Sequence, residues 1–286
     1  MKPDSSDPQR TDAIERAHLR RPADTASTVH RYDVQAELSD LLRRFWIPVW
    51  SVPAGQESAQ QVLQYPVALM IITADYARFM GVRTGLSTTT LVGDGFGVGV
   101  MFQPAAGSLI SRGPMTEWAD RHGDLSEVMG EEGHRLTDEV RGLMSDDPWA
   151  EGLHRAAIAV VERALARYLP VDDEGLLVND IVRFVEDRSD VTRVAQVCDE
   201  YHLSERSLQR LTARRLGLNP KWLIQRRRLH EAADRLRAGT GSLADVAADL
   251  GYADQAHLSR DWQAVTGYTP GEFAREFGTE GQPGVR

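Results

Sequence analysis

Two stretches share one plan: VAQVCDEYHLSERSLQRLTARRLG, from Val194 to Gly217, and LADVAADLGYADQAHLSRDWQAVTG, from Leu243 to Gly267. Each reads as a short helix with small apolar residues, a turn, and a second helix that begins after a polar residue. Ser204 and Asp254 are these polar residues, and their side-chain oxygens can accept hydrogen bonds from the first unpaired N–H groups of a helix. The pattern predicts two helix-turn-helix units, with second helices at 204–215 and 254–266.

The second helix of each unit is predicted to be apolar on one side and polar on the other. Leu208 and Leu211 face inward in the first unit, as Leu258 and Trp262 do in the second. The opposite side suits the major groove, because Arg pairs with guanine edges and Gln with adenine edges; the alternative is a solvated polar face. Base contacts are expected from Arg206, Gln209, Arg210, Gln255, His257 and Arg260.

A basic helix from Pro220 to Arg237 is predicted between the units, because Pro at its start and Gly239 just past its end bracket it. It would span about 27 Å, which suits recognition helices roughly 34 Å, or one DNA turn, apart. At least one of its three consecutive arginines has to face the core, where Glu231 or Asp234 can pair with it. Phosphate contacts are expected from Arg214, Arg215, Lys221, Arg226, Arg227, Arg228 and Ser259.

The charge of the chain is unevenly distributed. The net charge of the 286 residues is −9, which by itself disfavours DNA binding. From Tyr201 to Arg237, however, ten Lys or Arg outnumber three Asp or Glu, whereas residues 1–200 carry 20 basic and 32 acidic side chains. Because phosphate contact depends on the local surface, the basic segment is compatible with nucleic-acid binding.

The segment from Thr192 to Phe277 resembles the DNA-binding domain of the AraC/XylS family of transcription regulators. The resemblance rests on LSERSLQRL, GLNPKWLIQRRRLHEAADRL and LADVAADLGYADQAHLSRDWQAVTGYTPGEF. Leu258 and Trp262 stand where the family usually carries phenylalanines, and Asp261 and Gln263 lie near a usually basic stretch. The resemblance implies a regulator that reads two successive major grooves of promoter DNA and acts with RNA polymerase as a further partner.

Residues 29–130 are predicted to form a β-rich regulatory domain. Short β-like runs separated by Gly, Pro and Asp are typical of a small sandwich or barrel. The order resembles the cupin-like sensory domains found ahead of such DNA-binding domains, and RRFWIPVWSVPAG, YPVALMIIT and GVGVMFQPAA resemble a divergent amino-terminal domain of AraC-type proteins. Strands are expected at 29–34, 45–52, 60–64, 67–73, 76–82, 88–92 and 96–102, with a short helix at 38–44.

Four alternating glycines, Gly93, Gly95, Gly97 and Gly99, invite comparison with a phosphate-binding loop. The spacing is wrong, and neither the Lys-Ser/Thr pair nor the strand–loop–helix context follows. Alternating glycines fit better with a strand that passes close to another backbone or to a ligand. A ligand cavity could be lined by apolar residues that core packing explains equally well: Leu69, Met70, Ile71, Phe79, Met101 and Phe102.

Residues 131–188 are predicted to be a helical connector with helices at 131–144, 148–168 and 176–187. An apolar stripe on the second helix, which includes Ala157 and Val161, fits either an internal core or a homodimer surface, and both remain open. The helix at 176–187 is expected to pack on the DNA-binding domain. Residues 188–190 are the expected hinge.

No pattern in the chain predicts catalysis. Its histidines lack metal-ligand spacing, and no nucleophile motif is present, so no catalytic, metal or cofactor site is expected. The single cysteine, Cys198, reads as a small buried hydrophobe, with a redox sensor as the lesser reading. The alternative function is a small-molecule-processing amino-terminal domain fused to an autoregulatory DNA-binding module.

The sequence therefore predicts an α+β chain with a cupin-like β-sandwich or barrel, a helical connector and an all-α DNA-binding domain at 189–278. Tails at 1–28 and 279–286 are expected to be disordered. A cytoplasmic regulator is expected, because no stretch is apolar enough for a membrane span and no secretory signal is present. A small-molecule effector and a homodimer are candidate partners, whereas the effector, the operator and the sign of regulation do not follow from the sequence.

Overall fold

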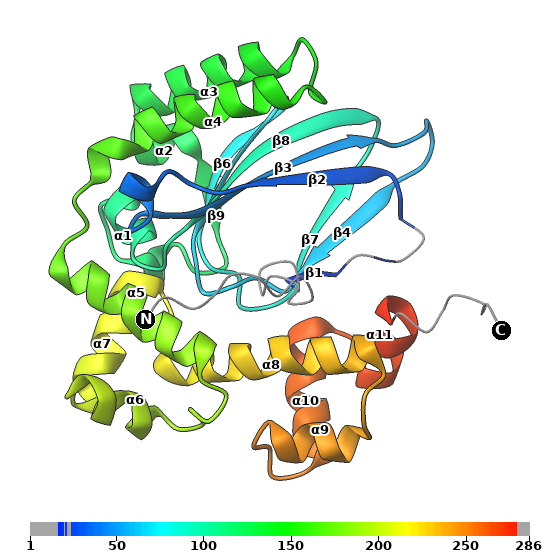
Figure 1. Cartoon of the computed structure of the whole chain (residues 1–286), viewed down its shortest axis with the longest axis vertical. Coiled ribbons are helices and arrows are strands. Elements are labelled where there is room, and N and C mark those ends of the chain that lie inside the picture. The colour runs from blue at the N-terminus through cyan, green and yellow to red at the C-terminus, as the bar shows by residue number, and fades with distance from the viewer. Residues whose placement is uncertain (1–16, 20, 22–23, 279–286) are drawn as a thin grey trace.

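The computed structural model describes residues 17–19, 21 and 24–278, and these form a sheet-rich amino-terminal domain and a helical carboxyl-terminal domain (Figure 1). The predicted tail at 279–286 and much of the one at 1–28 lie outside the described residues. Ala17 and Leu19 are nevertheless buried, and His18 pairs with Val62 in a β-ladder, so the expectation of a disordered tail is wrong for this part.

Two antiparallel sheets make up the amino-terminal domain. The large sheet has the strand order β2-β3-β8-β5-β6-β9, and the small sheet has the order β1-β4-β7. The large sheet contains β2 (Ser27–Tyr32), β3 (Leu42–Ser51), β5 (Leu69–Thr73), β6 (Ala77–Met80), β8 (Asp94–Phe102) and β9 (His122–Asp124). The small sheet contains β1 (His18–Leu19), β4 (Ser58–Val62) and β7 (Ser87–Leu91).

The predicted helix at 38–44 is wrong. A 3-10 turn, η2 (Ala36–Leu38), comes first, and β3 already begins at Leu42. Leu41 and Leu42 are both buried, and the pairing register with β8 shifts between Leu42 and Arg44. Such a bulge interrupts the alternation of buried and exposed residues by which a strand is recognised.

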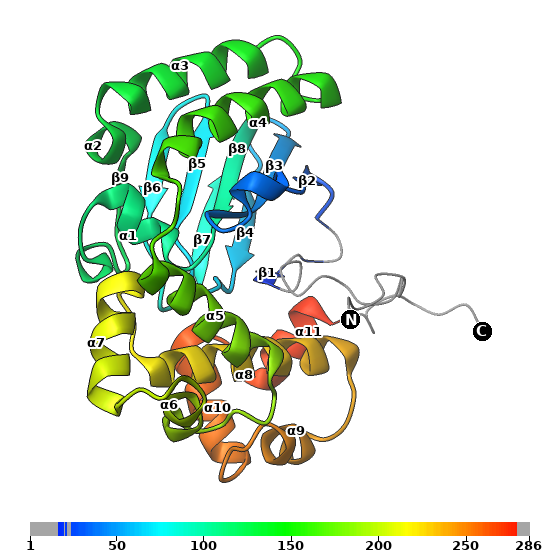
Figure 2. The same ribbon diagram turned by 60° about the vertical axis from the view of Figure 1, so that its left-hand side comes forward.

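The two faces of the large sheet have different neighbours. In β3, Phe45, Ile47 and Val49 are fully buried in the main apolar core, while Trp46 and Pro48 point to the opposite face and are only partly buried. Helices cover the core face, as Figure 2 shows for α3 and α4. The opposite face looks towards the small sheet.

The helices that follow β8 belong to the amino-terminal domain. They are α1 (Ala106–Ser111), α2 (Leu125–Met129), α3 (Glu131–Met144) and α4 (Glu151–Leu165), with 3-10 turns η3 (Met115–Glu117) and η4 (Ala166–Tyr168). Val140 of α3 and Val161 of α4 are fully buried in the same core as Phe45, so these helices complete the domain instead of forming a separate connector. The apolar stripe of α4 is therefore internal.

The carboxyl-terminal domain is helical throughout. It consists of α6 (Val194–Tyr201), α7 (Glu205–Leu216), α8 (Pro220–Ala238), α9 (Leu243–Asp249), α10 (Gln255–Thr266) and α11 (Pro270–Phe277). As predicted, the preceding helix α5 (Asp173–Asp187) packs on this domain, and its Ile181 and Val185 share a core with Leu208 and Leu223. None of the helices in the described ranges is long and apolar enough to cross a membrane.

The small sheet touches the carboxyl-terminal domain directly. Leu19 of β1 and Leu63, just after β4, lie in one apolar cluster with Leu229, Trp262 and Phe273. The two domains therefore share a core at this point, where Figure 1 shows the small sheet above α8 and α11.

Candidate functional site

The first helix-turn-helix unit has the predicted local structure. Ser204 caps α7, and its Oγ accepts a hydrogen bond of 3.2 Å from the Ser207 backbone N–H. The turn before it uses His202 in the left-handed region, at a φ of 51°. Leu208 is fully buried, which turns the opposite side of α7 outward.

The three predicted base readers of this unit are exposed on that outward side. Arg206, Gln209 and Arg210 are separated by helical spacing, and Gln209 Nε2 donates a 3.0 Å hydrogen bond to Glu205 Oε1. This arrangement presents two guanidinium groups and one amide to solvent along one face. Base contact by these residues stays a prediction.

The second unit repeats this plan around a larger core. Asp254 caps α10, and its Oδ1 accepts a 2.7 Å hydrogen bond from the His257 backbone N–H. Trp262 is fully buried, with its ring centroid 4.8 Å from that of Phe273. Gln255 and Arg260 are exposed, as predicted for readers.

His257 is less available than the other predicted readers. It is half-buried, its ring meets that of Tyr252 edge-on at 5.2 Å, and its Nε2 lies 3.9 Å from an Asp261 carboxylate oxygen. Ser259, predicted to contact phosphate, is half-buried as well. The polar face of α10 is therefore narrower than that of α7.

Three of the predicted phosphate contacts are contradicted by burial. Arg215, Arg226 and Arg227 are less than a tenth exposed. Arg226 Nη2 donates a 2.5 Å hydrogen bond to the Thr84 carbonyl of the amino-terminal domain, and its guanidinium lies 4.4 Å from the Trp222 ring centroid. Burial lowers the pKa of Arg226 to about 9.

The neighbouring arginines of α8 also bond within the protein. Arg227 donates to Glu231 Oε1 at 2.7 Å and to the Val191 carbonyl at 3.0 Å, the intramolecular alternative predicted for this run. Arg228 is half-buried and donates to the Thr192 carbonyl at 3.1 Å. The sequence did not predict the bonds to the Val191 and Thr192 carbonyls, because these groups lie 36 residues away in the chain.

Arg215 joins the end of α7 to α5. It forms ion pairs with Asp172 and Glu174, and its Nη1 also donates a 3.3 Å hydrogen bond to Ser108 Oγ of α1. Arg214 is exposed and pairs with Glu174. Of the predicted phosphate contacts, Arg214 and Lys221 are the exposed ones, and Lys221 lies at the start of α8.

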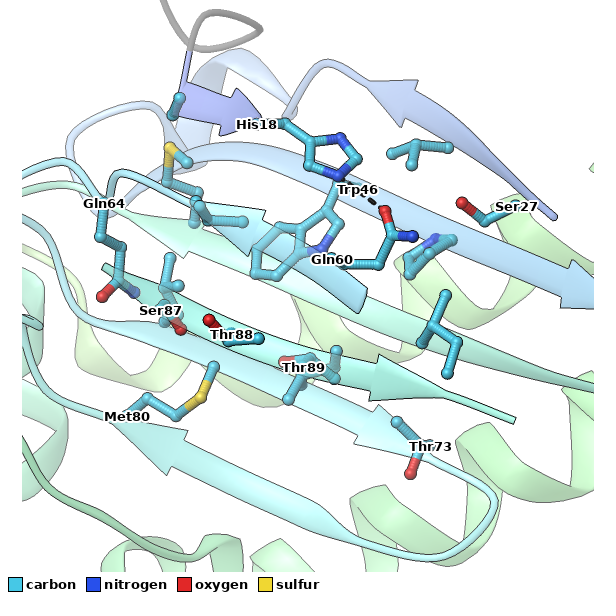
Figure 3. Close-up of a pocket in the computed structure, with 18 of the residues that line it drawn as sticks. His18, Ser27, Trp46, Gln60, Gln64, Thr73, Met80, Ser87, Thr88 and Thr89 are labelled. Atoms are coloured by element: carbon cyan, nitrogen blue, oxygen red, sulfur yellow. Dashed lines mark hydrogen bonds between the residues drawn. The ribbon is translucent and has the colours of Figure 1, made fainter. Parts of the chain in front are cut away.

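A cavity of about 510 Å³ lies between the two sheets of the amino-terminal domain (Figure 3). Its floor comes from the outward face of the large sheet, including Trp46, Trp50 and Ile71. Its opposite wall comes from the small sheet, where His18 Nε2 and Gln60 Oε1 lie 2.8 Å apart. A cavity of this size matches those that hold small organic ligands.

The alternating glycines of β8 make room for the floor of this cavity. A Cβ atom on Gly95 would lie 2.3 Å from the Trp50 ring, and one on Gly99 would lie 2.2 Å from the Trp46 ring. The two indoles therefore lie directly over glycine backbone. The prediction was a close approach to another backbone or to a ligand, whereas the groups that approach Gly95 and Gly99 are two indole side chains.

The six apolar residues considered as cavity lining divide by strand alternation. Leu69, Ile71 and Met101 line the cavity, whereas Met70, Phe79 and Phe102 are fully buried in the core on the other face. Sequence reasoning missed the polar and aromatic lining altogether. The available signal was the period of two in β3, which places Arg44, Trp46, Pro48 and Trp50 on one face.

The remaining candidate chemistry is sparse. Burial raises the pKa of the Cys198 thiol, which disfavours the reactive thiolate. Within the described residues, no group of three or more His, Cys, Asp or Glu side chains is arranged to hold a metal ion.

Two segments match described protein families. Residues 197–276 match a family described as a helix-turn-helix domain, and residues 30–124 match a domain of unknown function, DUF6597. The carboxyl-terminal domain is thus a helix-turn-helix domain. Its two units and their connecting helix have the order that the sequence predicted.

Relatives with assigned names match about a third of the chain. An uncharacterized HTH-type transcriptional regulator of Bacillus subtilis, YfiF, is 26% identical over 36% of this chain and 33% of its own length. The HTH-type transcriptional activator RhaS of Escherichia coli O1:K1 is 30% identical over 32% of this chain and 34% of its own. The chain thus spans about a third of the length of these relatives.

Solved structures of ToxT from Vibrio cholerae resemble the chain more broadly but more weakly. ToxT of strain O395 is 13% identical, with a TM-score of 0.39 over 88% of this chain and 97% of that one. A second ToxT structure, in complex with a naphthalenyl butenoic acid, is 14% identical with a TM-score of 0.40 over 88% of this chain and 99% of its own.

Proposed function

We propose that this chain is a sequence-specific DNA-binding transcription regulator of the AraC/XylS type. One observation carries the proposal: two capped helix-turn-helix units, joined by the 19-residue helix α8, each turn a polar face to solvent. A helix of that length spans about 28 Å, which is compatible with reading two major grooves on one side of a duplex. Promoter DNA is therefore the first partner we propose.

Within this function the two kinds of contact have separate roles. Phosphate contacts position a protein on DNA, while side chains in the groove specify the sequence. We assign base reading to Arg206, Gln209 and Arg210 of α7, with Gln255 and Arg260 of α10 as the second set. Lys221, which is exposed at the start of α8, is the leading phosphate contact.

The amino-terminal domain has a direct route by which to control the second unit. The Leu86 backbone N–H, just before β7, donates a 3.0 Å hydrogen bond to the Val265 carbonyl at the end of α10. Tyr268 Oη, just after α10, donates a 3.2 Å hydrogen bond to Gln61 Oε1 of β4. Because β4 and β7 also form one wall of the cavity, we propose that an occupant of the cavity changes the position of the second unit.

The ligand would then regulate transcription by changing the distance between the two recognition helices. If the second unit alone moves, the two units no longer meet successive grooves at the same separation, and affinity for the operator changes. Cytoplasmic location, RNA polymerase as a partner and a homodimer belong to the same proposal.

The test is binding of the full chain to its own upstream DNA over a salt series, with random duplex as competitor. We expect selective binding that weakens as salt rises, because phosphate contacts release counterions. Arg206→Ala together with Arg210→Ala should cost about 1–3 kcal/mol for each base that is no longer read and relax base preference at those positions.

The matched control replaces two arginines of α4, Arg155 and Arg163, by alanine. Their side chains are 68% and 69% exposed, and they pair with other residues of the amino-terminal domain. This variant removes the same charge and should leave the footprint unchanged. Equal affinity and base preference in the α7 variant and the wild type would refute the assignment of α7 as a reader.

A further inference from the structure

The register of the large sheet places five residues in one row across the four neighbouring strand pairs from β2 to β6. Arg31 pairs with Trp46, Trp46 with Gly99, Gly99 with Ile71, and Ile71 with Arg78. All except Gly99 line the cavity. The row therefore has an indole over glycine and an aliphatic side chain in the middle, with a guanidinium group at each end.

The middle of this row forms a flat apolar surface. Because the Trp46 ring occupies the space that a Cβ on Gly99 would need, the indole lies against the sheet instead of standing upright. Pro48 and Ile71 come close to Gly97 in the same way, at 3.4 and 3.1 Å from the position of its missing Cβ. A flat floor of this kind favours a planar or extended apolar ligand, since such a ligand buries the most surface against it.

The charge of the cavity has one sign. Among the described residues that line it, Arg31, Arg44 and Arg78 carry positive charge and none is Asp or Glu. The residues up to position 200 nevertheless carry 32 acidic and 20 basic side chains. Positive side chains collected in a concave site within an acidic domain favour the entry of an anion.

Arg78 is the arginine best placed to bind an anion within the cavity. It is half-buried, and its guanidinium lies over the Tyr76 ring, 4.2 Å from the ring centroid. Stacking uses the face of a guanidinium and leaves its N–H edge for a carboxylate, which it can bind in a two-point arrangement. Arg31 at the other end of the row is exposed and lies at the rim.

The wall opposite the floor carries several polar side chains, and none of the described residues in it is Asp or Glu. It contributes Gln60, Ser87 and Thr89, and Gln60 is oriented by His18 and by a 2.7 Å hydrogen bond from its Nε2 to Asp24. Such groups can accept or donate single hydrogen bonds without adding a competing negative charge. They fit a ligand with one anionic end and few other polar atoms.

From these features we infer that the cavity binds an organic carboxylate with a flat apolar body. The body lies on Trp46 and Ile71, and the carboxylate pairs with Arg78. The inference names the class of effector for the regulator proposed above. It also stands apart from that proposal, since ligand binding is measurable without DNA.

Calorimetric titration of the full chain tests the inference with three probes of one shape. Indole-3-acetate carries the carboxylate, indole-3-acetamide is its neutral counterpart, and tryptamine is a cationic relative. We expect indole-3-acetate to bind at least about tenfold more tightly than the amide, because a charge-assisted hydrogen bond usually increases affinity by that factor. Tryptamine should bind most weakly. Equal affinity for the acetate and the amide, or no binding of any probe at millimolar concentration, would overturn the inference.

Substitution of Arg78 locates the carboxylate. Arg78→Met should weaken acetate binding roughly tenfold and leave amide binding unchanged, while Arg78→Lys should restore part of the loss. The matched control is Arg135→Met, because Arg135 lies on α3 with its side chain 73% exposed. If Arg78→Met binds the acetate as the wild type does, the assigned position is wrong.

The DNA experiment keeps the two proposals separate. If the chain binds its promoter selectively but binds the three probes with equal affinity, the regulator assignment stands and only the carboxylate effector is refuted. A chain that binds indole-3-acetate through Arg78 but shows no DNA selectivity keeps the ligand site and loses the regulator assignment.

Discussion

The two helix-turn-helix units have the same plan but different supports. The first is held by α5, whose Ile181 and Val185 share its core, and by the ion pairs of Arg215. The second is held by α11 and by the small sheet, whose neighbouring Leu63 lies in its core. The small sheet, which forms one wall of the cavity, thus adjoins the core of the second unit, whereas the amino-terminal domain contributes Val82 and Ala105 to the core of the first. This difference is the basis for proposing that an occupant of the cavity acts on the second unit.

The largest expected effect comes from the core of the second unit. Trp262→Ala removes a fully buried side chain and should lower the free energy of unfolding by about 3–5 kcal/mol. Urea denaturation followed by circular dichroism measures the loss. Hydrogen exchange should then increase in α9–α11 before it increases in α6 and α7. An equal increase in both units would show that they unfold together and that their supports are not separate.

Loss of the second set of readers should have a smaller effect. Gln255→Ala with Arg260→Ala is expected to cost about 1–3 kcal/mol for each base that these side chains read. Footprinting and affinity for mutated operators would show relaxed preference about one DNA turn from the bases read by α7. If preference relaxes at the bases read by α7 instead, the two units do not read separate grooves.

Substitutions of Lys221 and Arg226 in α8 compare an exposed basic side chain with a buried one. Lys221→Met should reduce the salt dependence of DNA binding, because one phosphate contact changes the logarithmic slope by about 0.9. Arg226→Met should leave that slope unchanged and have little effect on stability, since replacing a buried charge by an apolar side chain is often neutral or stabilising. A reduced slope for Arg226→Met would restore it as a phosphate contact.

The smallest effect concerns acid sensitivity. Hydrogen bonds from Ser242 lower the pKa of Asp245, and hydrogen bonds from Thr269 lower that of Glu272, at the caps of α9 and α11. A carboxylate whose pKa is lower in the folded state stabilises the fold above its ordinary pKa, and this contribution is lost as pH falls through the lowered value.

The first unit caps α7 with Ser204, which does not titrate in this range. Acidification should therefore weaken the capping of α9 and α11 and leave the capping of α7 unchanged. Carboxyl chemical shifts followed by NMR from pH 5 to 2 should give midpoints below the ordinary pKa values for Asp245 and Glu272. Midpoints at the ordinary values would remove this difference between the units.

The helices of the DNA-binding domain could be predicted closely because local signals agree there. Ser204 and Asp254 occupy the cap positions expected of them, and Pro220 begins the connecting helix. Pro148 misled the same reasoning: α4 begins only at Glu151, because Asp147 Oδ1 accepts a hydrogen bond from the Trp149 backbone N–H in a turn ahead of it. A proline near a helix start does not fix the start when a competing turn is available.

Long-range contacts account for what the sequence could not predict. Arg226 looks like a surface cation, but its partner, the Thr84 carbonyl, is distant in the chain, whereas the pairing of Arg227 with Glu231 is local and was predicted. The cavity row likewise depends on the register of separate strands, which hydrophobic pattern alone does not specify when one sheet face is lined by Trp, Arg and Gly. The exposed readers of α7 were predictable because they depend on one helix only.

Leu19 and Leu63 also set a limit on dissecting the protein. A fragment beginning near residue 170 would retain α5 and lose only Val82 and Ala105 from the apolar core of the first unit. The same fragment would uncover the face of the second unit on which these two leucines pack. The isolated carboxyl-terminal domain would therefore expose an apolar patch that favours aggregation. A soluble version requires polar substitutions on that face or retention of the strands that cover it.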